Sequence, residues 1–211
     1  MNPATPMFPL GSVLFPHMPL QLRVFEERYV VMLSRILEVE PSEFGVVLIE
    51  RGQETGGGEQ RFPIGTLAQI THVEAAEGHL MLLAEGARRV RVVQWLDDDP
   101  YPRAVVEPLG DLVWDDALAP RFQRAEQVVR RALALASEFA DQQWSASVEI
   151  SDDRVAAAWQ LAAIAPLGSL DQLTMLQSES LEQLLDRIID LLAEAEIRFS
   201  ADWHASEDEL D

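Results

Sequence analysis

In the first half of the chain, apolar residues recur at every second position or in short runs, a pattern typical of β-strands. The segment from residue 7 to residue 24 is apolar but interrupted by prolines, each of which removes a hydrogen-bond donor and fixes φ. We therefore expect two short, kinked strands there. The adjacent Val92 and Val93 break an alternating run and indicate a β-bulge. Further strands are predicted at residues 45–51, 64–74, 80–85, 89–96 and 103–107.

One helix interrupts the predicted strands, between Glu26 and Val39. Its apolar residues recur three and four positions apart and fall on one face, and the acidic residues of its first turn favour the helix dipole. Pro41 ends this helix. Past residue 110, β-branched runs give way to Ala, Leu, Gln and Glu. This change predicts helices at residues 115–140, at 155–165, from 169 onward and at 180–199.

Serines stand where the caps of three predicted helices are expected. Ser151 can cap the helix at 155–165. Ser169 with Gln172, and Ser180 with Gln183, have the spacing of a capping box. In the last helix the apolar side chains expected to face inward are Leu181, Leu184, Leu185, Ile188 and Leu192.

The predicted elements divide the chain into three parts. Residues 1–109 form a β-rich, mostly antiparallel domain with one helix, and residues 110–202 form an acidic α-helical bundle. Residues 203–211 are too acidic and polar to pack, so we expect a disordered tail. The fold class is therefore α+β.

Charge limits the partners that the protein can bind. The net charge is −20 over 211 residues, which opposes nucleic-acid binding because cationic side chains supply most of that affinity. Residues 1–109 carry 15 acidic residues and 9 arginines, whereas residues 110–211 carry 21 and 7. The acidic half indicates a well-solvated helical surface, and a docking face for a basic partner is the alternative.

Missing residue types limit the chemistry. The chain has no cysteine and no lysine, which excludes disulfides, thiolate chemistry, the phosphate-binding loop lysine and a Ser–Lys dyad. No nucleophile-elbow motif occurs, and no histidine has another nearby in sequence, although His72 and His79 could meet across a predicted hairpin. We expect no enzymatic activity, no metal and no cofactor. With no apolar run of roughly 20 residues and no basic leader, we expect a cytoplasmic protein without a membrane span.

Ordered motifs cover about the first 100 residues. They read FPL at 8–10, LFP at 14–16, PLQLRVFEERY at 19–29, FGVVL at 44–48, IGTLA at 64–68 and LAEGARRV at 83–90. This order resembles the substrate-binding domain of Lon proteases, the LON domain. The resemblance implies a PUA-like pseudo-barrel followed by a helical bundle, here as a free-standing domain without ATPase or protease modules. By residue type we assign to the fold Pro9, Phe15, Leu22, Phe25, Gly45, Gly65 and Gly86.

The resemblance also implies a function, which is the binding of unfolded or exposed protein segments as an adaptor or holdase. Candidate contact residues are His17 and Met18, between two prolines, and Trp95 and Tyr101, around an acidic turn. Core packing is the competing explanation for Met18 and Trp95, and it is the one that we favour. Methionine and aromatic side chains suit such a surface because they adapt to varied ligands.

Other functions stay open at this point. A scaffold could dock one folded partner through the acidic helical face, with an opposing basic patch at Arg88, Arg89 and Arg91. RNA binding, suggested by other PUA-like folds, is opposed by the net charge, and a hydrolase without a recognisable motif is the remaining alternative. The sequence names neither a client nor an oligomeric state.

Overall fold

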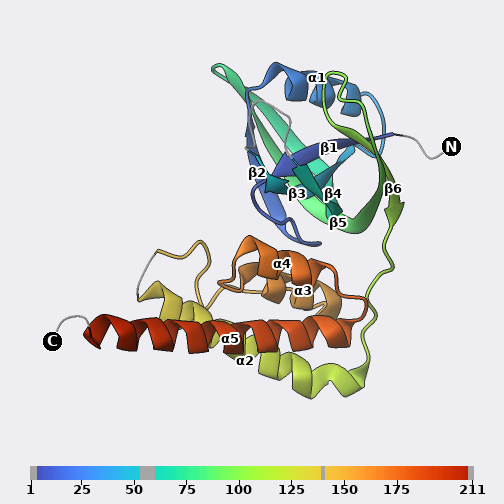
Figure 1. Cartoon of the computed structure of the whole chain (residues 1–211). Helices are drawn as coiled ribbons and strands as arrows, with labels where there is room; N and C mark the ends of the chain where they lie inside the picture. Colours follow the sequence, from blue (N-terminus) through green and yellow to red (C-terminus); the bar gives the residue numbers. More distant parts are fainter. Residues whose placement is uncertain (1–3, 53–59, 139–140, 209–211) are drawn as a thin grey trace. The chain divides into compact units, whose positions relative to one another are not determined.

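The computed structural model describes residues 4–52, 60–138 and 141–208, with side chains up to residue 196. The chain forms two compact units, Met1–Asp111 and Leu112–Asp211, close to the predicted boundary after residue 109. We call them the β unit and the helical unit and describe each by itself (Figure 1). The polar, glycine-rich segment 52–61 is predicted from the sequence as a loop or hairpin tip, and its residues 53–59 lie outside the described residues.

The β unit holds a six-stranded sheet and one helix. The sheet order is β2-β5-β4-β3-β1-β6, and β6 also pairs with β5. Five strands therefore form a closed ring of pairings, with β2 attached to β5 outside it (Figure 1). The sheet is mixed, because β1 and β3 pair in parallel while the other pairings are antiparallel. The elements are β1 (Thr5–Leu10), β2 (Pro19–Val24), α1 (Glu27–Ile36), β3 (Glu43–Arg51), β4 (Gln60–Ala76), β5 (His79–Leu96) and β6 (Arg103–Pro108).

Strand β5 closes the ring because it is long enough to have two partners on one side. Its first half pairs with β2 and its second half with β6. The sequence predicted two separate runs here, which is wrong, because strand pairing continues through Gly86. The register shifts between Val92 and Gln94, which confirms the predicted bulge.

Buried side chains fill the interior of the ring. Met7, Val47, Val92 and Ala104 come from four different ring strands and pack as one cluster. Interior side chains of small barrels alternate with exterior ones along each strand, so such a ring is a packed core. Helix α1 adds its apolar face, whose buried residues are Tyr29, Met32, Leu33 and Ile36.

The proline-rich loop, residues 11–18, is held against β4 and β5 by hydrogen bonds. The Thr66 hydroxyl donates to the carbonyl of Leu14 at 2.6 Å. The amide of His17 donates to the carbonyl of Gly86 at 2.7 Å, and the amide of Gly86 donates to the carbonyl of Met18 at 2.9 Å. These partners satisfy backbone groups that a loop interrupted by prolines cannot pair within itself.

Phe25 corrects one of our expectations. The sequence assigned Phe25 to the fold, yet its side chain is 59% exposed. The preceding residue, Val24, is buried at the end of β2. Phe25 is the residue that follows β2, and its exposed side chain therefore does not fill the core.

The helical unit consists of four α-helices after a short 3-10 turn. Helix α5 packs against α2, α3 and α4 (Figure 1). The five inward residues predicted for α5 are all buried, as helical spacing requires. The elements are η1 (Asp116–Leu118), α2 (Ala119–Ser137), α3 (Arg154–Ile164), α4 (Ser169–Leu176) and α5 (Leu181–Asp208).

Two of the three predicted caps are wrong. Asp153, rather than Ser151, caps α3, because its carboxylate accepts a hydrogen bond from the amide of Ala156 at 2.8 Å. The hydroxyl of Ser151 instead accepts from the amide of Asp153. Helix α4 begins at Ser169, so the N-cap is the preceding Gly168, which has no side chain to accept a bond.

The third predicted cap and the end of α5 have different outcomes. At the start of α5, the amide of Gln183 donates to the hydroxyl of Ser180 at 3.1 Å, as predicted. The helix then continues to Asp208, whereas the sequence predicted a disordered tail from residue 203. Extending an existing helix costs less than starting one, which lets polar residues continue it. Residues 209–211 lie outside the described residues.

Candidate functional site

The predicted contact pair in the proline-rich loop divides into one exposed and one buried residue. His17 is exposed and has a left-handed backbone with φ of 61°. Met18 is buried, which agrees with the competing explanation that it is a core residue. Of the two, only His17 is exposed.

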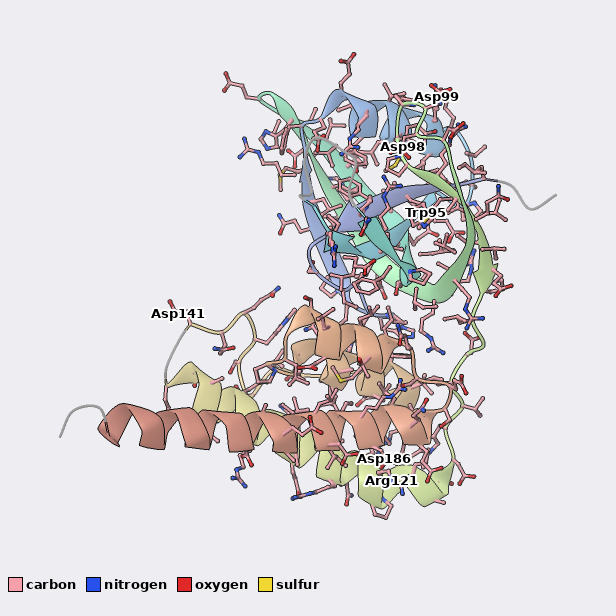
Figure 2. The ribbon with its side chains drawn as sticks, viewed as in Figure 1. Trp95, Asp98, Asp99, Arg121, Asp141 and Asp186 are labelled. Carbon is pink, nitrogen blue, oxygen red and sulfur yellow. The ribbon has the colours of Figure 1, made fainter. Side chains whose placement is uncertain are left out.

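Trp95 and Tyr101 are covered by arginines of the same unit. The Arg61 guanidinium lies 4.8 Å from the centre of the Trp95 ring and forms a 3.0 Å ion pair with Asp98. Figure 2 labels Trp95 and Asp98 in the β unit. Trp95 also packs against the core of the ring. Tyr101 is buried, and its hydroxyl accepts a 3.4 Å hydrogen bond from Arg35. Both aromatic rings are thus engaged internally rather than open to a peptide.

A groove of about 560 Å³ lies within the β unit, and every strand of the ring contributes to it. We call it the ring groove. Helix α1 and the residues that follow it complete its lining. Ligand sites are often found at the mouths of β-barrels. Its apolar lining includes Ile36, Val39, Leu67, Val90 and Val106.

The five named apolar residues differ in their exposure. Ile36, Leu67 and Val90 are buried. Val39 is 63% exposed. An apolar ligand that covered Val39 would remove this surface from water, which is favourable.

Four charged residues also line the ring groove. Arg88 donates a hydrogen bond to Glu43 Oε1 at 2.8 Å, and the Glu43 side chain is only 10% exposed. The other oxygen, Oε2, is buried without a hydrogen-bond partner among the described residues. Glu40 is exposed and forms no ion pair within the described part of the chain. The Arg35 guanidinium lies 5.5 Å from the Tyr101 ring centre.

Val39, Glu40 and Glu43, which line the ring groove, were not predicted from the sequence as candidate site residues. Val39 and Glu40 lie in the connection that follows α1, and Glu43 is the first residue of β3. No periodic pattern there distinguishes a groove residue from an ordinary surface residue. The only signal is an apolar residue flanked by acids just before Pro41. A groove that depends on ring closure has no local signature.

The predicted basic patch does not form. Arg88 pairs with Glu43, and Arg91 pairs with Glu107 at 3.3 Å. Arg89 is buried and donates to the carbonyl of Gly110 at 2.7 Å. Burial lowers the pKa of Arg89, although a nearby aspartate opposes the shift. The three arginines therefore serve internal contacts.

His72 and His79, which could have met across the predicted hairpin, are not paired with each other. In the hairpin of β4 and β5, His72 pairs with Leu83, and His79 pairs with Ala76. Among the described residues, no three His, Cys, Asp or Glu side chains are grouped so that they could hold a metal ion. No helix of the described part of the chain is long and apolar enough to cross a membrane.

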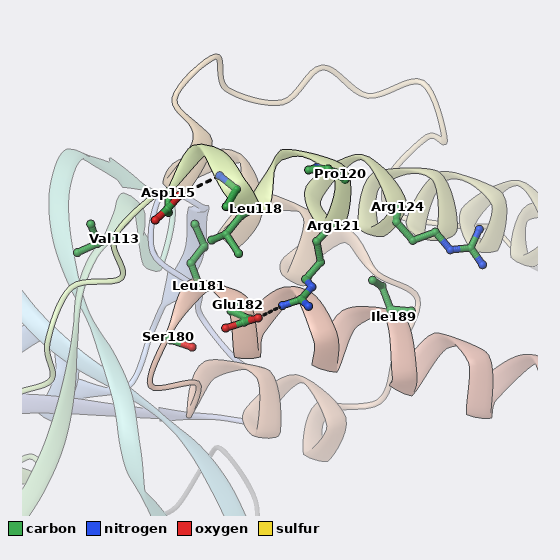
Figure 3. A pocket seen from close by; sticks show the side chains of 11 residues that line it. Val113, Asp115, Leu118, Pro120, Arg121, Arg124, Ser180, Leu181, Glu182 and Ile189 are labelled. Carbon is green, nitrogen blue, oxygen red and sulfur yellow. Dashed lines mark hydrogen bonds and ion pairs between the residues drawn. The ribbon is translucent and has the colours of Figure 1, made fainter.

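The helical unit has a hollow of its own, of about 690 Å³, between the start of α2 and the start of α5 (Figure 3). Arg121 lies in it and forms ion pairs with Glu182 and with Asp186, the latter at 3.2 Å. The hydrogen bond that Arg121 donates to the Glu182 carboxylate raises the pKa of Arg121. Two carboxylates already balance this cation, so we place the candidate site in the ring groove, where a buried carboxylate oxygen has no hydrogen-bond partner among the described residues.

A sequence model of one family, the ATP-dependent protease La (LON) substrate-binding domain, matches residues 4–194. The chain belongs to this family. It is 26% identical over 199 residues to a Lon protease of Koribacter versatilis, covering 89% of this chain and 24% of that protein. It is 28% identical over 115 residues to a LON peptidase N-terminal domain and RING finger protein of Schizosaccharomyces pombe, covering 48% of this chain and 23% of that protein. The chain thus spans about a quarter of these relatives.

Solved structures show the same fold. A Lon N-terminal domain protein from Xanthomonas campestris has a TM-score of 0.64 and 25% identity, covering 89% of this chain and 98% of that chain. The N-terminal domain of a Mycobacterium avium complex Lon protease has a TM-score of 0.62 at 14% identity, covering 90% and 98%. The second likeness concerns the fold alone. All these matches are to the substrate-binding domain, not to a protease or ATPase domain.

Proposed function

We propose that this protein is a non-catalytic module that recognises exposed segments of other proteins and that the ring groove holds them. The family is named for binding the substrates of a protease, and those substrates are polypeptides. Such a module would serve as an adaptor that delivers clients or as a holdase that shields them. The closed ring of strands supports a PUA-like pseudo-barrel for the β unit, followed by a helical bundle.

The apolar lining of the ring groove is the observation that carries this proposal. Polypeptide clients expose apolar side chains when they are unfolded, and burying apolar surface contributes roughly 25 cal/mol per Å². The groove is lined by the exposed Val39 together with the buried Ile36, Leu67 and Val90. Segments of varied sequence could bind there without a fixed set of hydrogen bonds.

A pair of matched valines tests this placement. Val39 is 63% exposed and lines the groove, whereas Val93 is 60% exposed and lies outside it. Val39→Asp puts a charge where the ligand's apolar side chains would pack. We expect it to weaken binding about tenfold, the ratio that corresponds to ~1.4 kcal/mol. Val93→Asp adds the same charge and should leave binding unchanged.

Fluorescence anisotropy with a labelled, destabilised client protein gives the affinities. The folded parent of that client is the negative control. If the wild-type protein binds the destabilised client no better than its folded parent, the recognition function is wrong. If both valine variants weaken binding equally, the function stands but the groove is not its site.

A further inference from the structure

We propose that the ring groove selects cationic apolar segments, in which an arginine or lysine lies among apolar residues, and that Glu43 receives the cation. In the free protein, Arg88 occupies the place of that cation. The inference rests on the proposed function and adds the chemical class of the client.

The first observation is the incomplete pairing of Glu43. One carboxylate oxygen accepts a hydrogen bond from Arg88, while the other is buried and has no hydrogen-bond partner among the described residues. A carboxylate has about four lone-pair sites and forms its strongest bonds with cationic donors. A buried anion that is only partly satisfied is costly, so an added donor would be favourable.

The second observation is the contrast in exposure within the pair. The Arg88 side chain is 52% exposed, whereas that of Glu43 is 10% exposed. The cation can therefore leave for water at little cost, but the carboxylate cannot, because it is fixed among the groove residues. A client guanidinium or ammonium that displaces Arg88 exchanges one ion pair for another, while the client's apolar neighbours cover the lining.

The remaining charges of the groove agree with this choice. Arg35 is directed at Tyr101, with which it forms a hydrogen bond and a ring contact. Glu40 lines the groove, is exposed, and has no ion-pair partner within the described ranges. The whole chain carries a net charge of −20, which attracts cationic segments and repels acidic ones over a distance.

The test uses the full chain and three short peptides of alternating leucine and serine. The central residue is arginine, its neutral analogue citrulline, or glutamate. We expect the wild-type protein to bind the arginine peptide about tenfold more tightly than the citrulline peptide, a ratio equal to ~1.4 kcal/mol. The glutamate peptide should bind more weakly than either. Anisotropy of labelled peptides gives each affinity.

Two arginines of strand β5, Arg88 and Arg91, each form an ion pair with a glutamate of another strand, and variants of these two pairs locate the cation site. Glu43→Gln should abolish the preference for arginine over citrulline. Arg88→Met should increase affinity for the arginine peptide about tenfold and leave the citrulline peptide unchanged. Glu107→Gln and Arg91→Met are the controls, because Arg91 is 53% exposed, like Arg88, and its pair lies outside the groove.

Each outcome has a defined meaning. Binding of all three peptides with equal affinity overturns the cation preference but leaves the proposed function intact, whereas no binding of any peptide overturns both. An unchanged preference in Glu43→Gln, or weaker arginine binding in Arg88→Met, also overturns the inference. If Glu43→Gln does not fold, the double variant with Arg88→Met removes both partners of the pair and should fold without any preference.

Discussion

A methyl group added at Gly86 tests how the proline-rich loop is held against strand β5. The Gly86 amide and carbonyl bond to the loop at Met18 and His17. An ideal Cβ built on Gly86 would lie only 2.1 Å from the carbonyl oxygen of Phe15. This close approach concerns backbone, so no side-chain rotation can relieve it.

The expected cost follows from that distance. Ordinary contact begins at 3.4 Å, so the loop or the strand must move by more than an ångström in Gly86→Ala. Overpacking of this kind costs about 1–3 kcal/mol. The two hydrogen bonds that would be strained contribute a net ~0.5–1.5 kcal/mol each. We expect the β unit to be destabilised by about 3 kcal/mol.

Thermal unfolding and hydrogen exchange measure this effect. For a domain of about 100 residues, each kcal/mol lowers Tm by roughly 4–8 °C, so the β unit should unfold on the order of 10–20 °C earlier. Exchange of the β4 and β5 amides assigns the loss to this unit. The control is Gly110→Ala, whose added Cβ meets nothing within 4 Å. A Gly86→Ala protein within ~1 kcal/mol of that control would refute the close-packing argument.

Two further predictions concern the helical unit. Leu184 is completely buried in α5, so Leu184→Ala should lower the free energy of unfolding, measured with denaturant, by about 2–5 kcal/mol. The control Leu170→Ala, at a 63% exposed position, should lower it little. Equal losses of stability in the two variants would contradict the burial of Leu184. Asp153→Ala removes the N-cap of α3 and should lower the free energy of unfolding by about 1 kcal/mol. A larger loss of stability from Ser151→Ala would show that Ser151, and not Asp153, caps the helix.

Elements that depend on nearby residues could be predicted from the sequence. The sequence predicts a strand at residues 103–107, and β6 is observed at Arg103–Pro108. The alternation of apolar and polar residues breaks at Val92 and Val93, which predicts the bulge seen in the register of β5 and β6. Helical spacing predicts the buried face of α5. These patterns repeat over a few residues and follow directly from the periods of the strand and the helix.

Predictions failed where neighbouring residues compete for one role. Ser151 and Asp153 both suit an N-cap, and only the observed start of α3 decides between them. Phe25 belongs to an apolar motif, yet it lies just after the end of β2 and its side chain is exposed. Met18 and Tyr101 were candidate contacts, but neither is available to a ligand because both are buried.

The amino-acid sequence by itself determined the β-then-α order, the absence of lysine and cysteine chemistry, the strong negative charge and the resemblance to the LON family. Only the tertiary structure decided where the groove lies. The pairing of β4 with both β3 and β5 brings Glu43 and Arg88 together, and the pairing of β6 with both β1 and β5 closes the ring and adds Val106 to the groove. Pairings between residues so far apart are set by burial of the whole core, which no local period reveals.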